Sequence, residues 1–372
     1  MKVFHCGQCA AQIYFENTVC GACQATLMFV PAELDICATA APQDPSAQVA
    51  YTSALGAPIK PCAQRFSAAP CSWALALDDP QTSCISCRLT RWEQSAPMLD
   101  NSARWLLAES AKRRLLFTLL SLHIPFAPKQ SDADNNGLAF EWKLPSAGVP
   151  VITGHADGLI TLDLQETDDA HREATRVAFA EPLRSVLGHL RHEMAHHLQQ
   201  RFVTTPEQLD SFRALFGDER ADYAAALQQH YKAGPPADGA ERFISAYASA
   251  HPWEDWAETC AHYLLMVDAV QTASAWGLRL DQVPGLATAV VNAPAHVDEL
   301  VFSQWLPVAR FLNAMARTLG SRDSYPFVIP SPVLDKLRFV QRVLNDAAQQ
   351  TPVNPQPGAV ERTIEPFISM PV

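Results

Sequence analysis

The sequence lacks any long apolar run. A helix that crosses a bilayer needs about 20 mostly apolar residues, and the longest apolar stretches, such as Leu115–Leu122, are shorter or interrupted. The first residues, MKVFHCGQC, hold a cysteine pair where a secretion signal has its apolar segment. We therefore expect a cytoplasmic protein with no membrane partner, in which clustered cysteines bind metal rather than form disulfides.

Positive charge is also scarce. The 372 residues carry a formal net charge of −11 at pH 7, and the first 95 residues hold five Lys and Arg side chains against seven acidic ones. Proteins that bind nucleic acids usually carry a basic patch that pairs with phosphates. The sequence therefore predicts no nucleic-acid partner. A hydrophobic content of 48% is ordinary for a globular protein and excludes wholesale disorder.

Two closely spaced cysteine pairs stand near the start of the chain. Cys6 and Cys9 form one CxxC motif, and Cys20 and Cys23 form a second after ten intervening residues. Each motif places two thiolates on a tight turn, and two such turns complete a tetrahedral zinc site. This spacing is typical of a zinc ribbon, with a structural zinc ion held by four thiolates and no position left for water.

A second cysteine cluster has looser spacing. Cys62, Cys71, Cys84 and Cys87 are compatible with another four-thiolate zinc site, although only the last two form a CxxC motif. Cys37 is left over and could replace Cys62 as a ligand. Because this segment has few large apolar residues, we expect metal binding to supply much of its folding energy. The region could also bind a protein partner.

Nine of the ten cysteines precede residue 90, which predicts a domain boundary near residues 90–100. We expect an α+β protein with a zinc-ribbon region at 1–95, a mainly helical domain with a small sheet at 100–350, and a Pro-rich tail at 351–372. Apolar spacing predicts the elements of the second domain. The expected helices are Ser102–His123, Glu181–Arg201, Pro206–Phe216, Glu219–Tyr231, Glu241–Ala248, Pro252–Val270, Gln304–Leu319 and Ser331–Gln349, and the expected strands are Leu138–Leu144 and Gly158–Leu164.

The helix predicted at 181–201 contains an HExxH motif. His192 and His196 are four residues apart, so they lie on one helix face and can bind one zinc ion. Glu193, beside the first ligand, can act as general base toward a zinc-bound water. The motif alone also arises by chance. The helix gains support from an apolar stripe made by Leu183, Leu187, Leu190, Met194 and Leu198.

A catalytic zinc site needs a third protein ligand and an open fourth position. Glu254 and Glu258 lie one turn apart on the helix predicted to begin at Pro252. This arrangement resembles that of gluzincins, which implies that Glu254 is the ligand and that Glu258 orients a ligating histidine. The reverse assignment is possible, and His251 and His262 are weaker candidates. An acidic first turn that favours the helix dipole would also explain Glu254.

Tyr247 precedes Glu254 by seven residues, and its phenol could donate a hydrogen bond to the oxyanion of a tetrahedral intermediate. This interval resembles that in the catalytic domain of anthrax lethal factor. A lone tyrosine is more often part of a core.

Several segments together resemble a bacterial family of zinc-binding metallopeptidases with an N-terminal zinc ribbon. The matching stretches are MKVFHCGQC, FENTVCGAC, CSWAL, CISCRLTR, LRHEMAHHLQ, FGDERADYAAALQQHY and ISAYASAHPWEDWAETCAHYL. One departure is Cys260, where an aromatic residue is more usual. The resemblance implies a zincin-like domain, one catalytic and one or two structural Zn²⁺ ions, and a peptide or protein substrate. The alternative is a non-enzymatic zinc-ribbon adaptor with a structural or vestigial HExxH site.

Overall fold

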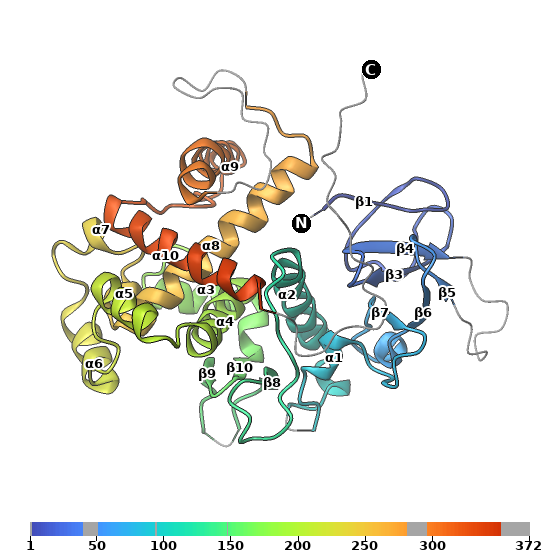
Figure 1. Cartoon of the computed structure of the whole chain (residues 1–372), viewed down its shortest axis with the longest axis horizontal. Coiled ribbons are helices and arrows are strands. Elements are labelled where there is room, and N and C mark those ends of the chain that lie inside the picture. The colour runs from blue at the N-terminus through green and yellow to red at the C-terminus, as the bar shows by residue number, and fades with distance from the viewer. Residues whose placement is uncertain (1, 40–50, 94, 147, 281–295, 351–372) are drawn as a thin grey trace.

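The computed structural model describes residues 2–39, 51–93, 95–146, 148–280 and 296–350. The tail predicted at 351–372 lies outside the described residues. The protein has the expected α+β fold, in which a region of short strands precedes a mainly helical domain with one small sheet (Figure 1). Figure 1 shows the strands β1–β7 at one side of the molecule, the helices from α3 onward at the other, and α2 between them.

The N-terminal region consists of short antiparallel strands joined by turns that carry cysteines. β1 pairs with β2 across the first CxxC turn, β3 pairs with β4, and β6 lies between β5 and β7. A one-turn helix, α1 (Ile85–Arg88), closes the region. The strands are β1 Phe4–His5, β2 Gln12–Ile13, β3 Thr26–Val30, β4 Asp35–Thr39, β5 Tyr51–Thr52, β6 Pro58–Pro61 and β7 Ala74–Ala76.

Helix α2 (Ser102–Ser121) joins the two parts of the chain into one core. Its Phe117 contacts aromatic rings of the N-terminal region, with centroid distances of 5.5 Å to Phe15 and 5.8 Å to Phe29. Trp73 packs against Phe29 at 4.9 Å in the same cluster. The other side of α2 packs against the HExxH helix. The N-terminal region is therefore packed into the fold through α2.

The small sheet of the helical domain has the order β8–β10–β9. β8 (Ala139–Lys143) and β10 (Leu159–Asp163) confirm the two predicted strands and pair in parallel register. Sequence analysis missed β9 (Gly154–Ala156), which pairs antiparallel with β10 through a two-residue turn at Asp157 and Gly158. Both turn residues have positive φ, 46° and 83°, as a type I′ hairpin requires. The Asp-Gly pair was the available signal for this hairpin.

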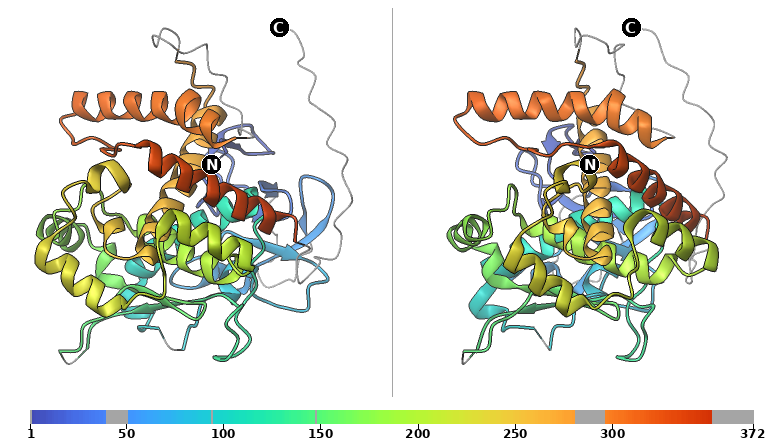
Figure 2. Two further views of the ribbon diagram at one scale, coloured as in Figure 1. Left: turned by 60° about the vertical axis from the view of Figure 1, so that its left-hand side comes forward. Right: turned by 90° about the vertical axis from the view of Figure 1, so that its left-hand side faces the viewer.

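Helices make up the rest of the described chain. In both views of Figure 2, α9 lies at the outer edge with α10 beneath it. A π-helix at Glu299–Trp305 leads into α9. The helices after α2 are α3 Asp169–Ala178, α4 Val186–Phe202, α5 Pro206–Phe216, α6 Tyr223–Ala233, α7 Gly239–Arg242, α8 Pro252–Ala275, α9 Leu306–Thr318 and α10 Ser331–Ala348.

Two of the helices predicted after α4 are shortened or replaced in the structure. The helix expected at Glu219–Tyr231 begins at Tyr223, because the Asp222 side chain caps it by accepting the backbone N–H of Ala225. The helix expected at Glu241–Ala248 is replaced by α7 and a 3₁₀ turn at Tyr247–Ser249, with extended backbone at Phe243 between them. Sequence analysis also missed α3. No described helix is long and apolar enough to cross a membrane.

Candidate metal centre

The HExxH motif lies in the middle of α4. The helix begins at Val186 rather than near Glu181, because the Ser185 hydroxyl accepts the N–H of Gly188 and caps it. Leu183 therefore precedes the helix and is 41% exposed, so its place in the predicted apolar stripe is wrong. Residues Leu190, Met194 and Leu198 of that stripe are buried. Because these three side chains are held in the core, they fix the rotation of α4 about its axis and thereby the direction of the two histidines.

Helix α8 carries the acidic residues and packs closely against α4. Pro252 occupies its first turn, where the missing N–H costs nothing, and the His251 side chain caps it by accepting the N–H of Trp253. The fully buried Ala257 leaves room for α4, and the Trp256 indole donates to the carbonyl of Ala195 at 2.8 Å. These contacts place Glu254 opposite the two histidines.

Three side chains of α4 and α8 converge on one point. The Nε2 atoms of His192 and His196 lie 3.2 Å apart, and Glu254 Oε2 lies 3.0 Å and 3.7 Å from them. All three candidate ligand atoms lie within 4.8 Å of one another. Two imidazoles and one carboxylate are the donor set of a catalytic zinc site, which keeps a fourth position for water or substrate. The side chains present therefore fit a zinc ion.

Glu258 holds the other side of the His192 ring. Its Oε1 lies 2.8 Å from His192 Nδ1, and its Oε2 accepts the Ser245 hydroxyl at 2.6 Å. A histidine ligand commonly binds a carboxylate through its second nitrogen, which fixes the ring orientation and its tautomer. In the structure Glu254 is the carboxylate beside both Nε2 atoms, whereas Glu258 contacts Nδ1. The geometry therefore favours Glu254 as the ligand and Glu258 as the residue that orients His192.

The electrostatics of the cluster keep Glu254 negatively charged. Burial lowers the pKa of His192, but hydrogen bonds with Glu254 and Glu258 outweigh it and raise that pKa well above its usual value. Burial raises the pKa of Glu254, and its hydrogen bonds with His192 and His196 reverse this to a net lowering. Glu254 is therefore ionised although it is only 2% exposed. A buried negative charge of this kind requires a positive partner.

Glu193 lies in α4 next to His192 and is 7% exposed. It makes no hydrogen bond or ion pair with another described residue, although its charge contributes to the raised pKa of His192. A carboxylate that is buried close to the cluster and has no partner in the described part of the chain is available to accept a proton.

Two tyrosines border the cluster, and sequence analysis singled out one. The Tyr247 ring lies 5.9 Å from the His192 ring. The missed residue is Tyr223, at the start of α6, whose hydroxyl donates to Glu254 Oε1 at 2.8 Å. Burial and the charge of Glu254 raise the pKa of both tyrosines, so both hydroxyls stay protonated. The signal for Tyr223 was its place in the FGDERADY stretch.

The first cysteine cluster has the geometry of a tetrahedral zinc site. Cys6 and Cys23 have Sγ atoms 3.6 Å apart, and those of Cys9 and Cys20 are 3.7 Å apart. A tetrahedron with zinc–sulfur bonds of about 2.3 Å has sulfur–sulfur edges of about 3.8 Å. A disulfide would need about 2.05 Å. The four thiols are free and fit zinc, with Cys9 and Cys23 exposed to solvent.

The second cluster brings together Cys62, Cys71, Cys84 and Cys87, all of them buried. The Sγ atoms of Cys71 and Cys84 lie 3.7 Å apart, again the edge of a zinc–thiolate tetrahedron. Cys37 is not part of this cluster, because it lies in β4 and its thiol donates to the carbonyl of Thr52.

Four thiolates on one zinc ion carry a net charge of −2, and a cation lies beside the second cluster. Burial lowers the pKa of Arg113, but the charges of Cys71, Glu109 and the neighbouring thiolates give a net rise. Arg113 belongs to α2, which also carries Phe117. The second cluster is therefore tied electrostatically to the helix that joins the two parts of the chain.

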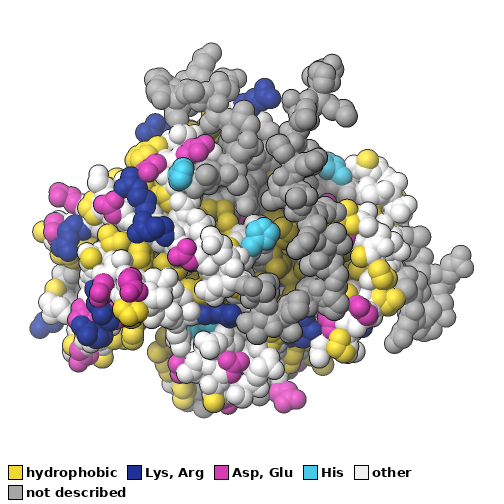
Figure 3. All heavy atoms as spheres, in the orientation of Figure 1, with side chains coloured by type: hydrophobic (Ala, Val, Ile, Leu, Met, Phe, Trp, Pro, Cys, Tyr) yellow, Lys and Arg dark blue, Asp and Glu magenta, His cyan; other side chains and the backbone are white. Residues whose placement is uncertain are grey.

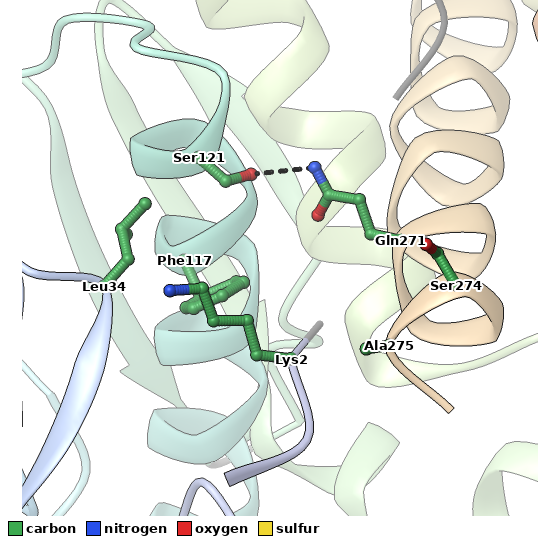
Figure 4. A pocket seen from close by; sticks show the side chains of 7 residues that line it. All are labelled: Lys2, Leu34, Phe117, Ser121, Gln271, Ser274 and Ala275. Atoms are coloured by element: carbon green, nitrogen blue, oxygen red, sulfur yellow. Dashed lines mark hydrogen bonds between the residues drawn. The ribbon is translucent and has the colours of Figure 1, made fainter. Parts of the chain in front are cut away.

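Two other surface features lie apart from the metal cluster. A cavity of about 270 Å³ lies between Lys2, Phe117 and the C-terminal end of α8, where Gln271 donates to Ser121 (Figure 4). Glu254 lies near the opposite end of α8. On the face shown in Figure 3, Lys and Arg side chains are interspersed with Asp and Glu side chains rather than gathered into one basic patch.

Two cysteine clusters and a His–His–Glu cluster are the donor sets of a zinc-binding protein. The chain belongs to the family described as "Putative zinc-binding metallo-peptidase", whose profile matches residues 101–343, and a zinc-ribbon domain profile matches residues 3–99. It is 39% identical over 352 residues to proteins of Mycobacterium bovis and Mycobacterium tuberculosis, covering 94% of this chain and 96% of theirs. Those relatives are described as uncharacterized. No solved structure matches the chain significantly.

Proposed function

We propose that the protein is a zinc-dependent peptidase that hydrolyses an amide bond of a peptide or protein. The observation that carries this proposal is the convergence of His192, His196 and Glu254 on one point beside Glu193. In a purely structural zinc site all four positions are filled by protein. Here the cluster found among the described residues contains three ligands, which favours an enzyme over a non-enzymatic adaptor.

His192, His196 and Glu254 would hold the zinc ion, and Glu258 keeps the His192 ring in place. When bound, zinc would activate a water molecule and polarise the scissile carbonyl. Glu193 accepts a proton from the attacking water and later delivers it to the leaving amine nitrogen. The Tyr247 hydroxyl, which stays protonated, can donate a hydrogen bond to the oxygen that becomes negative.

The substrate would lie along β9 rather than β10. β10 has no free edge for an extended substrate, because β8 and β9 already occupy both of its edges. β9 pairs only with β10 among the described strands, so its other edge can add an extended peptide. His155 of β9 lies 6.3 Å, ring to ring, from His196, so this edge passes the metal cluster.

The test compares wild type with Glu193→Gln and with Glu207→Gln, an exposed control in α5. Mass spectrometry of a peptide mixture should show cleavage by wild type and the control, and none by Glu193→Gln. Elemental analysis should find the same zinc content in all three. Cleavage retained by Glu193→Gln would overturn the mechanism, and a zinc-loaded wild type that cleaves no peptide would favour the adaptor.

We propose a cytoplasmic protein that acts on peptides or proteins and binds neither nucleic acid nor membrane. A protein partner could bind the zinc-ribbon region, although the burial of Phe117 in that region supports a structural role for it.

A further inference from the structure

Helix α6 is weakly packed, yet it reaches the metal cluster. None of its residues is buried, whereas α4 and α8 each contain several buried residues. Near its N-terminal end His251 Nε2 lies 3.1 Å from the carbonyl of Ala221, and near its C-terminal end the His230 ring packs on Tyr247 with centroids 6.0 Å apart. Segments with few buried contacts belong to the least stable parts of a protein. The order of α6 therefore depends on a small number of specific contacts.

Tyr223 makes the most direct of these contacts. Its hydroxyl donates to Glu254 Oε1 at 2.8 Å, while Glu254 Oε2 faces His192 and His196. Among the described residues, Tyr223 is the one hydrogen-bond partner of Oε1. The tyrosine ring is itself held by packing on His251, with ring centroids 5.2 Å apart. One oxygen of Glu254 is thus occupied by α6, and the other is left for the metal.

We propose that Tyr223 is a positioning residue that keeps Glu254 monodentate toward the metal and couples the order of α6 to metal binding. If Oε1 lost its donor, it would be a buried acceptor without a partner, or it would turn toward the metal. A bidentate Glu254 would occupy the position that water needs. Because coupling is reciprocal, a metal that fixes Glu254 also fixes Tyr223 and, through it, α6.

The first test measures metal affinity and coordination in Tyr223→Phe. Its control is Tyr231→Phe, which removes the same hydroxyl from a tyrosine of α6 that is 63% exposed. Loss of an outer-shell partner typically weakens metal affinity about 10- to 100-fold. We expect this loss of metal affinity in Tyr223→Phe but not in Tyr231→Phe. Competition for zinc with chelators of known affinity measures it. The visible bands of cobalt bound to nitrogen and oxygen ligands should also change, while the intense cobalt–thiolate bands should not.

The second test measures hydrogen exchange of the α6 amides in zinc-loaded full-length protein. Wild type and Tyr231→Phe should protect α6, whereas Tyr223→Phe should exchange there as fast as His192→Ala, which lacks a metal ligand. Thermal melting checks that Tyr223→Phe remains folded. Unchanged zinc affinity and cobalt spectrum in Tyr223→Phe would overturn the positioning role, and unchanged α6 protection would overturn the coupling.

The inference rests on the metal centre of the proposed function but not on hydrolysis. If wild type cleaves no peptide and Tyr223→Phe still weakens metal binding, the positioning role stands and the peptidase proposal fails. If wild type cleaves peptides and Tyr223→Phe binds metal as wild type does, the peptidase proposal stands and the positioning role fails.

Discussion

Replacing Lys112 with Met should strongly destabilise the protein. Lys112 lies in α2 and is 0% exposed, and its ammonium group donates to Glu109, to Thr90 and to the carbonyl of Ser86. Ser86 lies in α1 between Cys84 and Cys87. One buried ammonium group thus joins α2 to the helix that carries part of the second cysteine cluster.

The magnitude follows from what the substitution leaves behind. Glu109 is also 0% exposed and would lose an ion pair of 2.8 Å, although Arg113 at 3.4 Å and the Trp142 indole would remain. Removing one partner of a buried ion pair usually costs about 3–5 kcal/mol. Because Arg113 still offsets part of the charge of Glu109, we expect a loss of about 3 kcal/mol, near the lower end of that range.

Urea-induced unfolding with zinc present measures this loss in the free energy of unfolding. Lys232→Met, at an exposed position, should stay within about 0.5 kcal/mol of wild type. In a Glu109→Gln background Lys112→Met should cost about 1–2 kcal/mol less, because no buried carboxylate then loses its nearest cation. The reasoning is refuted if Lys112→Met costs under about 1 kcal/mol, or if Glu109→Gln does not reduce its cost.

Three other results are expected. Phe117→Ala should lower the free energy of unfolding by about 3–5 kcal/mol in urea titrations, because it leaves a cavity between α2 and the aromatic cluster. A chromophoric chelator should remove zinc faster from the first cysteine cluster, with two exposed ligands, than from the buried second one, and equal rates would contradict this. Although burial opposes it, hydrogen bonds with His189 and Arg184 lower the pKa of Glu166 from 4.5 to about 2. This depressed pKa stabilises the fold above about pH 4.5 and less as the pH falls toward 2. Because each pKa unit is worth about 1.4 kcal/mol, Glu166→Gln should cost about 3 kcal/mol at pH 7. The difference in the free energy of unfolding between Glu166→Gln and wild type should become smaller in acid. A difference that is constant with pH would rule out the ionised carboxylate as its cause.

Local patterns predicted the elements that carry the candidate ligands. HExxH at helical spacing placed His192 and His196 on one face of α4, and Pro252 marked the start of α8. The start of α4 was predicted too early because Leu183 continues the apolar spacing, whereas Ser185 supplies the cap that begins the helix. Spacing alone does not show which of two plausible starts has a hydrogen bond to stabilise it.

Contacts between distant segments could not be predicted in the same way. Tyr223 is 31 residues from Glu254, and nothing in its own neighbourhood indicates which acceptor its hydroxyl reaches. The short strand β9 has too few residues to show alternation, and only the Asp-Gly turn marked it. The helix α3 buries no side chain, so it has no apolar stripe facing a core. None of these three features leaves an apolar periodicity in the sequence from which it could be predicted.

The cysteine clusters and the candidate metal centre are connected through one helix. Lys112 and Arg113 of α2 donate to the carbonyls of Ser86 and Pro70, next to cysteines of the second cluster. Phe117 of α2 packs in the core of the N-terminal region, and α2 packs against α4. A zinc ribbon that was only an appended binding module would not need to share its core with the helix behind the HExxH motif. Because this interface is buried and partly charged, loss of either thiolate-bound zinc should disturb α2 before it disturbs α8. Zinc ions held by the cysteine clusters would therefore support His192 and His196 through α2 more directly than they would support Glu254.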